Sequence, residues 1–291
     1  MHISTERIIG WYDAVGRDLP WREPGVGAWK ILVSEFMLQQ TPVSRVLPKW
    51  TEWVQRWPTP SATAAASAAD VLRAWGKLGY PRRAMRLYEC ATIIARDHGD
   101  EVPDDVETLL TLPGVGEYTA RAVACFAYDQ PVPVVDTNVR RVVARAVHGH
   151  AQAGNPSNTR DLADVAALLP DDARAPRFSA ALMELGALVC TARTPHCERC
   201  PLPDCAWRSA GQPAAEALPR RTQSYEGTDR QARGRLLDVA RTKHAPVTRA
   251  ELDLAWPADP GQRDRALDSL LVDGLLTQTA DGMFALPGEG E

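Results

Sequence analysis

The chain has 291 residues, 45% hydrophobic and 24% charged, with 37 acidic and 33 basic side chains and a net charge of −4. This composition is typical of a globular protein and argues against long disorder. No apolar run reaches the roughly 18 residues that a membrane span needs, and the charged N-terminus does not resemble a signal peptide. We therefore expect a cytoplasmic protein with no membrane partner. The acidic net charge leaves nucleic-acid binding open, because a local basic stripe would suffice.

Before residue 190 the sequence predicts a chain of amphipathic helices. Apolar residues recur at three- and four-residue steps, and short turns rich in proline and glycine separate the periodic segments. Strand-like alternation is nearly absent before residue 270. Helices are predicted over 29–40, 69–78, 83–94, 106–112, 118–128, 138–147 and 178–189.

Two of these helices are connected by the sequence Leu112-Pro113-Gly114-Val115-Gly116. Its glycines permit a sharp turn and the close approach of another backbone. The main-chain N–H groups that open the second helix can meet a phosphate oxygen. The pattern predicts a helix-hairpin-helix motif, which grips DNA without reading its sequence. Other helical hairpins also carry glycines, so the motif gains its weight from what surrounds it. Its candidate DNA contacts are Leu112, Gly114, Val115 and Gly116.

Two acids stand out around this hairpin. Glu35 lies within an otherwise apolar helical segment, and Asp136 begins the helix Asp136-Thr137-Asn138. An acid among apolar neighbours should have a raised pKa, whereas N–H groups at a helix start favour the anion. One neutral and one charged carboxyl form the pairing used for glycosidic bond cleavage. From these residues alone, the simpler alternatives are favoured: a solvated position for Glu35 and a plain N-cap for Asp136.

Four of the six cysteines fall within 16 residues, separated by gaps of six, two and four. Disulfides are disfavoured in a chain without an export signal. Four thiolates in one loop can bind either zinc or a [4Fe–4S] cluster. Structural zinc sites usually set two close pairs apart, whereas here one close pair stands between two single cysteines, and this spacing favours the cluster. The candidate ligands are Cys190, Cys197, Cys200 and Cys205.

The C-terminal part of the chain has a different organisation. Helical periodicity is lost over 211–228, which is typical of a linker. Three amphipathic segments at 229–242, 247–256 and 262–274 then precede two short apolar runs around an Asp-Gly turn. Such runs predict a hairpin. The outline is that of a small winged-helix-like α+β module over 229–291, a kind of domain that binds DNA or docks proteins.

Five motifs together resemble a known family. In chain order they are SEFMLQQT, WGKLGYPRRAMRL, LPGVGEYTARAVACFA, VVDTNVRRVVAR and ELGALVC-x6-C-x2-C. They resemble the helix-hairpin-helix glycosylases of the endonuclease III superfamily, and within it the MutY-type adenine glycosylases. The similarity runs from about Trp11 to Trp207.

The resemblance implies a mainly α helix-hairpin-helix glycosylase fold. It implies a six-helix barrel domain over 23–133 and an iron–sulfur cluster domain over 134–210, on which the N-terminal segment 1–22 packs. The implied cofactor is a [4Fe–4S] cluster. The implied partner is double-stranded DNA with adenine mispaired with 8-oxoguanine or guanine, bound by a monomer associated with the nucleoid. Replication or repair proteins are further partners that the sequence leaves open.

The resemblance also implies roles for single residues. Glu35 would protonate adenine N7 and later activate water, and Asp136, oriented by Asn138, would stabilise the sugar cation. Tyr118 stands where bifunctional relatives carry a lyase lysine, which implies a monofunctional glycosylase. Gln40 and Tyr80 would enter the base stack near the opposing base. Flipping a base costs least at a mispair, so mispairing itself contributes selectivity.

The resemblance places Trp29 near the base pocket. Some other positions depart from the family pattern. Ala180 stands where many relatives have a polar residue near the adenine pocket. Pro81 replaces a commonly aromatic position, and the last cysteine gap is four residues rather than five. The tail after the linker is short and lacks the features of the Nudix-like domain that senses 8-oxoguanine, so we expect a weaker preference for the oxidised base.

Two other functions compete with adenine excision. A thymine or uracil mismatch glycosylase of the same superfamily can also carry tyrosine at position 118, but it has no need for the N7 acid Glu35. A non-catalytic iron–sulfur DNA-binding protein would have no need for both Glu35 and Asp136.

Overall fold

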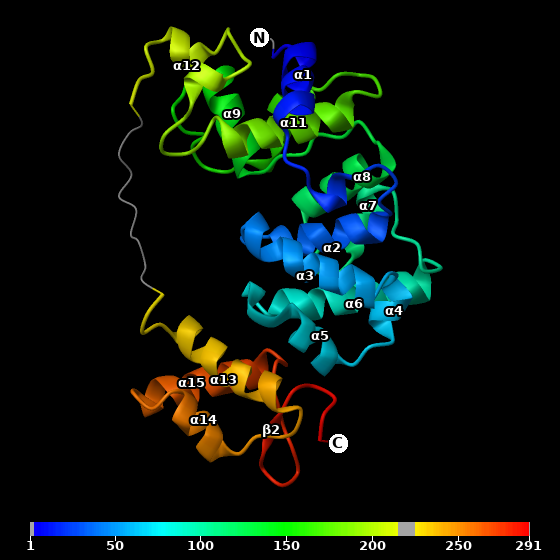
Figure 1. Ribbon diagram of the computed structural model, residues 1–291, viewed down its shortest axis with the longest axis vertical. Coiled ribbons are helices and arrows are strands. Elements are labelled where there is room, and N and C mark those ends of the chain that lie inside the picture. The colour runs from blue at the N-terminus through cyan, green and yellow to red at the C-terminus, as the bar shows by residue number, and fades with distance from the viewer. Residues whose placement is uncertain (1–2, 215–224, 291) are drawn as a thin grey trace. The chain divides into compact units, whose positions relative to one another are not determined.

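The computed structural model describes residues 3–214 and 225–290, and most of them are helical (Figure 1). The chain forms two compact units. The first unit comprises residues 1–32, 104–111 and 115–219, and the second comprises residues 33–103, 112–114 and 220–291. Within the predicted linker, residues 215–224 lie outside the described part of the chain. No helix among the described residues is long and apolar enough to cross a membrane.

The helices of the first unit include all those predicted between residues 106 and 189, with ends shifted by a few residues. The helix α11 begins at Ala175 rather than Phe178, and α1 and α10 have no counterpart among the predicted segments. Helix α2 begins in this unit and ends in the second. The elements are α1 (Thr5–Val15), η1 (Pro20–Arg22), α2 (Ala28–Leu38), α7 (Val106–Thr111), α8 (Glu117–Tyr128), α9 (Thr137–Ala146), α10 (Asn158–Ala166), α11 (Ala175–Leu188), η3 (Cys197–Arg199) and α12 (Ala206–Ser209).

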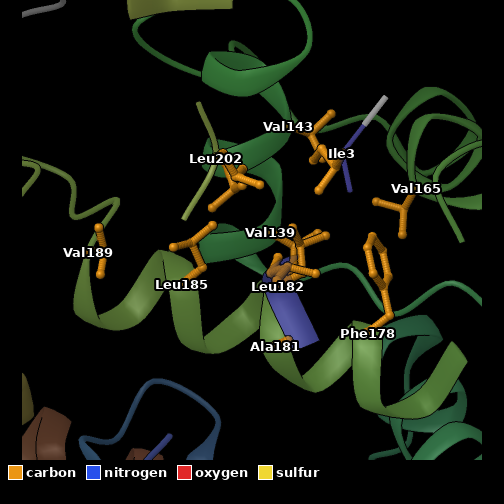
Figure 2. Close-up of a cluster of buried hydrophobic side chains, with 12 residues drawn as sticks. Ile3, Val139, Val143, Val165, Phe178, Ala181, Leu182, Leu185, Val189 and Leu202 are labelled. Carbon is orange, nitrogen blue, oxygen red and sulfur yellow. The ribbon is translucent and has the colours of Figure 1, made fainter. Parts of the chain in front are cut away.

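The core of the first unit is built around α11, which packs against α1 and α9. Phe178, Leu182 and Leu185 recur on one face of α11 at three- and four-residue steps and are fully or almost fully buried (Figure 2). They meet Val139 of α9 and Ile8 of α1. Each such side chain contributes about 1.5–3 kcal/mol of hydrophobic stabilisation. The apolar period of the sequence thus places α9 against α11.

A buried ion pair fixes the same helix to the segment after α1. Glu184 of α11 is buried, and its carboxylate accepts hydrogen bonds from Arg17 Nε (2.6 Å) and Nη2 (2.8 Å) and from Arg22 Nη1 (2.9 Å). Burial alone would raise the pKa of Glu184, but the hydrogen bonds from Arg17 and the charge of Arg22 lower it to about 2. The carboxylate therefore stays ionised because two guanidinium groups replace its water.

The second unit begins with helices that surround a cluster of tryptophans. Trp53 lies edge-to-face against Trp57 (4.7 Å between ring centroids) and against Trp75 (6.0 Å). Helix α3 contains Pro48 in its interior and is absent from the predicted segments. The elements are α3 (Val43–Arg56), α4 (Pro60–Ala64), α5 (Ala68–Trp75), η2 (Gly76–Leu78) and α6 (Arg82–Asp97).

The C-terminal module has three helices followed by a short hairpin, as its sequence predicts. The elements are α13 (Asp229–Lys243), α14 (Arg249–Ala255), α15 (Pro260–Val272), β1 (Thr277–Gln278) and β2 (Phe284–Ala285). Helix α13 packs against α14 and α15. The strands pair antiparallel, with Thr277 opposite Ala285 and Gln278 opposite Phe284. Gly282 adopts a φ of +79° in the turn between them, which is the reason for the Asp-Gly pair.

Replacing Glu184 by glutamine should destabilise the first unit in a pH-dependent way. Two half-buried guanidinium groups would lose their counter-charge, which costs less than the ~3–5 kcal/mol of a fully buried pair. Because the pKa of Glu184 is lowered from 4.5 to about 2 in the folded chain, its stabilising contribution is complete above about pH 4.5 and is lost as the pH falls towards 2. Urea denaturation of both proteins at several pH values measures this difference.

The matched control is Glu52→Gln, which removes a largely exposed partner of Lys49 and should change stability by less than about 1 kcal/mol. An equal effect of the two substitutions would contradict the prediction, as would a Glu184→Gln effect that does not shrink on acidification.

Candidate active site

Glu35 is buried in α2, with only 6% of its surface exposed. Its neighbours Ser34, Phe36 and Met37 are also buried. The solvated position that the sequence left open is therefore wrong. Burying a carboxyl in an apolar helix has a cost in free energy. A contact with solvent therefore does not account for an acid at this position.

Asp136 is the N-cap of α9, as its sequence context suggests. Its Oδ1 accepts a hydrogen bond from the Val139 backbone N–H (2.7 Å), and its Oδ2 accepts one from Asn138 Nδ2 (2.7 Å). Burial nevertheless raises the pKa of Asp136 above its usual range, and the hydrogen bonds from Val139 and Asn138 only partly offset that effect. The expectation that helix N–H groups would dominate is corrected here, because desolvation outweighs them.

Asn138 connects this carboxylate to the rest of the unit. Its Oδ1 accepts a hydrogen bond from Arg141 Nη2 (2.7 Å), which also donates to the Gly186 carbonyl (2.7 Å). Arg141 Nε donates to the carbonyl of Cys190 (2.7 Å). A Cβ at Gly186 would lie 2.6 Å from the Asn138 Cβ, so only glycine allows α11 this close to α9. The orientation of Asn138 thus depends on Gly186 and Arg141.

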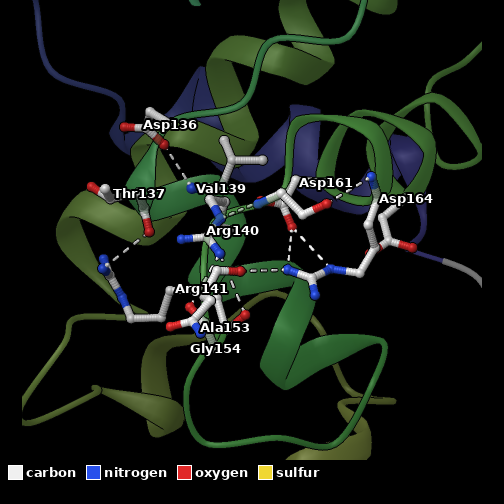
Figure 3. A network of polar contacts seen from close by, with 12 residues as sticks. Asp136, Thr137, Val139, Arg140, Arg141, Ala153, Gly154, Asp161 and Asp164 are labelled. Atoms are coloured by element: carbon white, nitrogen blue, oxygen red, sulfur yellow. Dashed lines mark hydrogen bonds and ion pairs between the residues drawn. The ribbon is translucent and has the colours of Figure 1, made fainter.

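Arg140 of α9 contacts the loop that follows this helix. Arg140 pairs with Asp161 of α10 (2.6 Å) and donates to the Gly154 carbonyl (3.2 Å), as Figure 3 shows. Asp161 is also the acceptor for the Ser157 backbone N–H (2.9 Å). Arg140 therefore connects the first part of α9, next to Asp136, to α10 and to the loop between the two helices.

The four clustered cysteines lie in the loop after α11. Burial raises the pKa of Cys200, and proximity to Cys190, Cys205 and Cys197 raises it further. Cys190 and Cys200 both pack against the hydrophobic core around α9 and α11, and Cys205 Sγ donates to the Arg145 carbonyl (3.5 Å). No three His, Cys, Asp or Glu side chains of residues 3–214 or 225–290 are gathered closely enough to hold a single metal ion.

Arg145 of α9 holds this cysteine loop. Its guanidinium is buried, lies over the ring of Trp207 (4.9 Å), and donates to the carbonyls of Thr191 (2.7 Å) and Ala192 (3.3 Å). It also donates to Cys190 Sγ (3.4 Å). Arg141 and Arg145 are four residues apart and therefore share one face of the helix. The sequence motif VVDTNVRRVVAR contains both, but nothing in their spacing alone reveals what they contact.

The hairpin has the conformation that its glycines predict. Gly114 has a φ of +80°, and a Cβ there would lie 2.7 Å from the Phe36 ring, the residue after Glu35. Leu112 and Val115 are buried, whereas Gly114 and Gly116 are exposed. Gly116 precedes α8 and provides no side-chain cap to its first N–H groups. The hairpin therefore leaves backbone donors at this helix start.

The remaining candidates occupy distinct positions. Gln40 and Tyr80 are exposed and have positive φ values of 55° and 47°. Tyr118 is half-buried and packs against a small cluster that includes Ala122 and Val134. Trp29 is buried in α2. The structure thus joins Asp136 to Asn138 and places the four cysteines in one segment after α11, while Glu35 and Asp136 belong to different units.

Residues 33–165 match the family model described as "HhH-GPD superfamily base excision DNA repair protein". The chain is 72% identical over 289 residues to an adenine DNA glycosylase of Mycobacterium tuberculosis (strain CDC 1551 / Oshkosh), covering 99% of this chain and 95% of the relative. It is 70% identical to an adenine DNA glycosylase of Mycolicibacterium smegmatis, covering 100% and 98%. A human adenine DNA glycosylase is 43% identical over 67% of this chain and 37% of the relative.

Solved structures share the fold of the catalytic part. A thermostable thymine-DNA glycosylase superposes with a TM-score of 0.65 at 26% identity, covering 71% of this chain and 95% of that chain. A trapped endonuclease III–DNA covalent intermediate superposes with a TM-score of 0.61 at 20% identity, covering 72% and 95%. The expected helix-hairpin-helix glycosylase fold is confirmed.

Substituting Gly186 by alanine should destabilise the first unit. The new Cβ would collide with the Asn138 Cβ and backbone carbonyl, and overpacking of this kind costs about 1–3 kcal/mol. Gly10→Ala in α1 is the control, because a Cβ there meets nothing within 4 Å; that change should stabilise the chain by about 0.5–1 kcal/mol through helix propensity. Thermal denaturation distinguishes the two, and equal melting temperatures would rule the steric argument out.

Proposed function

This chain belongs to the adenine DNA glycosylases of the HhH-GPD superfamily, and on that premise we propose that it excises adenine mispaired with 8-oxoguanine or guanine and leaves the abasic strand intact. Adenine excision from DNA in base excision repair is the activity of the family. The choice of mispair and the residue roles are the proposal. The observation that carries it is the burial of Glu35 at 6% exposure inside an apolar helix.

Glu35 acts as the general acid. It gives a proton to adenine N7, the C1′–N9 bond breaks with its electron pair passing to the base, and the sugar is left as a cation. Glu35 then accepts a proton from the water that attacks C1′. This step needs a carboxyl shielded from bulk solvent, which the position of Glu35 provides.

Asp136 stabilises the sugar cation. The two groups that donate to its carboxylate at 2.7 Å each, the Val139 N–H and the Asn138 amide, are both uncharged. A carboxylate whose negative charge is not already neutralised interacts most strongly with a cation formed during the reaction. Asn138 orients the carboxylate.

Tyr118 decides between glycosylase and lyase chemistry. A phenol cannot form a Schiff base with the sugar aldehyde, whereas a lysine amine can. The chain therefore releases the base without cutting the strand. Gln40 and Tyr80 enter the stack near the opposing base, Trp29 borders the base pocket, and the hairpin residues Leu112, Gly114, Val115 and Gly116 hold the backbone of the DNA.

A [4Fe–4S] cluster fits the four cysteines. Cys190 Sγ and Cys205 Sγ both contact Arg145, and Cys190 and Cys200 pack against the same hydrophobic core. Arg145 and Gln212 donate to Cys190 Sγ and Cys197 Sγ at 3.4 Å each, and N–H donors of this kind stabilise ligating thiolates. Cys190, Cys197, Cys200 and Cys205 would hold the cluster, which supplies a rigid cross-link of the loop.

Single-turnover excision from duplexes with adenine opposite 8-oxoguanine, guanine, cytosine or thymine tests the proposal. We expect fast excision opposite 8-oxoguanine and guanine, with strand breaks only after alkali. Similar rates opposite guanine and 8-oxoguanine would support the expected weak preference for the oxidised base, and a strong preference for 8-oxoguanine would contradict that expectation. Breaks without alkali would contradict the monofunctional assignment. Excision of thymine or uracil instead would favour the pyrimidine alternative.

Glu35→Gln should reduce the excision rate by roughly 10²–10⁴-fold, the usual contribution of a general acid. Glutamine keeps the size of the side chain but has no acidic proton. Electrophoretic binding to the same duplex should be retained, which separates lost chemistry from lost binding. Native-rate excision by this variant would overturn the role of Glu35.

Cys200→Ser should lower the iron content and the visible absorbance of the purified protein, because one thiolate ligand is lost. Cys90→Ala is the control: Cys90 is fully buried in α6, and burial raises the pKa of its thiol to about 12. That variant should retain its iron. Equal iron content in both variants would contradict the ligand assignment, and so would zinc in place of iron.

A further inference from the structure

We propose that Arg83 is a positioning residue that fixes the backbone of both Gln40 and Tyr80 and thereby sets where their side chains enter the DNA. This inference rests on the proposed function of those two residues. Arg83 belongs to α6 and lies in the same unit as both of them.

Gln40 and Tyr80 share an uncommon backbone conformation. Gln40 follows the end of α2 with a φ of 55°, and Tyr80 precedes α6 with a φ of 47°. The left-handed region is uncommon for residues other than glycine, and it persists only where the surroundings enforce it. Both side chains are exposed, and Tyr80 keeps 48% of its surface accessible. Their own packing therefore does not account for the conformation.

The guanidinium of Arg83 supplies the enforcing contacts on the Gln40 side. Its Nη1 donates to the carbonyls of Phe36 (2.8 Å), Met37 (3.1 Å) and Gln39 (2.6 Å). Its Nη2 donates to Thr41 Oγ1 (2.8 Å). The contacts therefore reach the residues immediately before and after Gln40. They also satisfy carbonyls at the C-terminus of α2, where a positive charge is favourable.

The same guanidinium reaches the Tyr80 side. Nη2 donates to the Gly79 carbonyl (3.1 Å), and the Arg83 backbone N–H donates to the Tyr80 carbonyl (2.9 Å). The charged plane also lies over the rings of Trp75 (5.1 Å) and Tyr80 (5.5 Å). One side chain thus ties two segments that are 40 residues apart in the sequence.

Arginine is the residue type that this arrangement needs. Five acceptors from two segments are reached by the two terminal nitrogens of one guanidinium, whereas the lysine ammonium has three donors on a single atom. Burial lowers the pKa of Arg83 to about 10, so the side chain remains charged at neutral pH. A neutral replacement would leave carbonyls at the end of α2 without a donor.

The test compares Arg83→Met and Arg83→Lys with Arg96→Met. Arg96 lies on the same helix, but it is largely exposed and pairs with the adjacent Asp97. Single-turnover excision is measured for adenine opposite guanine and opposite cytosine, and the ratio of the two rates reports contact with the opposing base. We expect this ratio to fall by roughly 10- to 100-fold in Arg83→Met, the usual effect of a misplaced contact group. Lysine should restore it only in part, and Arg96→Met should leave it unchanged.

A double-mutant cycle separates positioning from a general loss of structure. In a background of Gln40→Ala and Tyr80→Ala, the Arg83→Met change should alter the ratio no further, because the side chains it positions are gone. Thr41→Val removes the Oγ1 that accepts from Arg83 and that also donates to the Gln39 and Leu78 carbonyls (3.4 Å each); it keeps the other Arg83 contacts, so it provides a milder variant if Arg83→Met fails to fold. It should lower the ratio in the same direction at an unchanged melting temperature.

Three outcomes would overturn the inference: an unchanged ratio in both Arg83→Met and Thr41→Val, an equal fall in the rates on both duplexes, or an additive effect in the double-mutant background. The unaltered chain is assayed alongside. Failure of the unaltered chain to excise adenine would overturn the proposed function itself, whereas normal excision with an unchanged ratio in the variants would overturn the role of Arg83 alone.

Discussion

The close packing of α9 against α11 at Gly186 is the constraint on which the first unit depends. Because residue 186 has no side chain, the backbone of α11 meets Asn138 directly, and Arg141 can donate to the Gly186 carbonyl and to Asn138 with the same nitrogen. Asn138 in turn donates to Asp136. One turn further along α9, Arg145 holds the cysteine loop. A single helix therefore orients a carboxylate at its start and contacts the cysteine loop along its side, and its packing against α11 supports both.

A buried and a half-buried carboxylate in this unit have opposite pKa shifts. Glu184 receives two guanidinium groups, and its pKa is lowered to about 2. Asp136 accepts hydrogen bonds from the Val139 backbone N–H and the Asn138 amide, and burial raises its pKa. The charge of Arg141 also acts to lower the pKa of Asp136, as the last of the causes in order of size, and its donors are directed to Asn138 and to backbone carbonyls. The charge of Glu184 is neutralised by two guanidinium groups. Within the described part of the chain, the carboxylate of Asp136, the candidate catalytic acid, has no such ion pair and can therefore interact with a cation formed during the reaction.

Much of this architecture could be predicted from the sequence, because its signals are local. Apolar periodicity located α8, α9 and α11, and the glycines of the hairpin located its turn. Helix α3 escaped prediction because Pro48 normally interrupts a helix, and tertiary packing of Trp50 and Trp53 overrides that preference here. Arg83 escaped as a positioning residue for a different reason. In the sequence it is one of several cations in a basic stretch, and only the folded chain shows that its guanidinium faces carbonyls rather than solvent. Contacts between distant segments leave no periodic trace.

In the C-terminal module, the order of the helices and strands alone does not determine the function. The recognition helix of a helix-turn-helix domain presents its side chains to the major groove, and α15 is the third helix of this module. Its exposed side chains include Asp264, Asp268 and Arg265, and Val272 is 86% exposed at its end. Two of these three charged side chains are acids, which do not neutralise DNA phosphates. Phosphate neutralisation supplies most non-specific DNA affinity. The order of helices and hairpin therefore predicts the shape of the module, whereas the charges on α15 argue that its use differs from that of a DNA-reading helix.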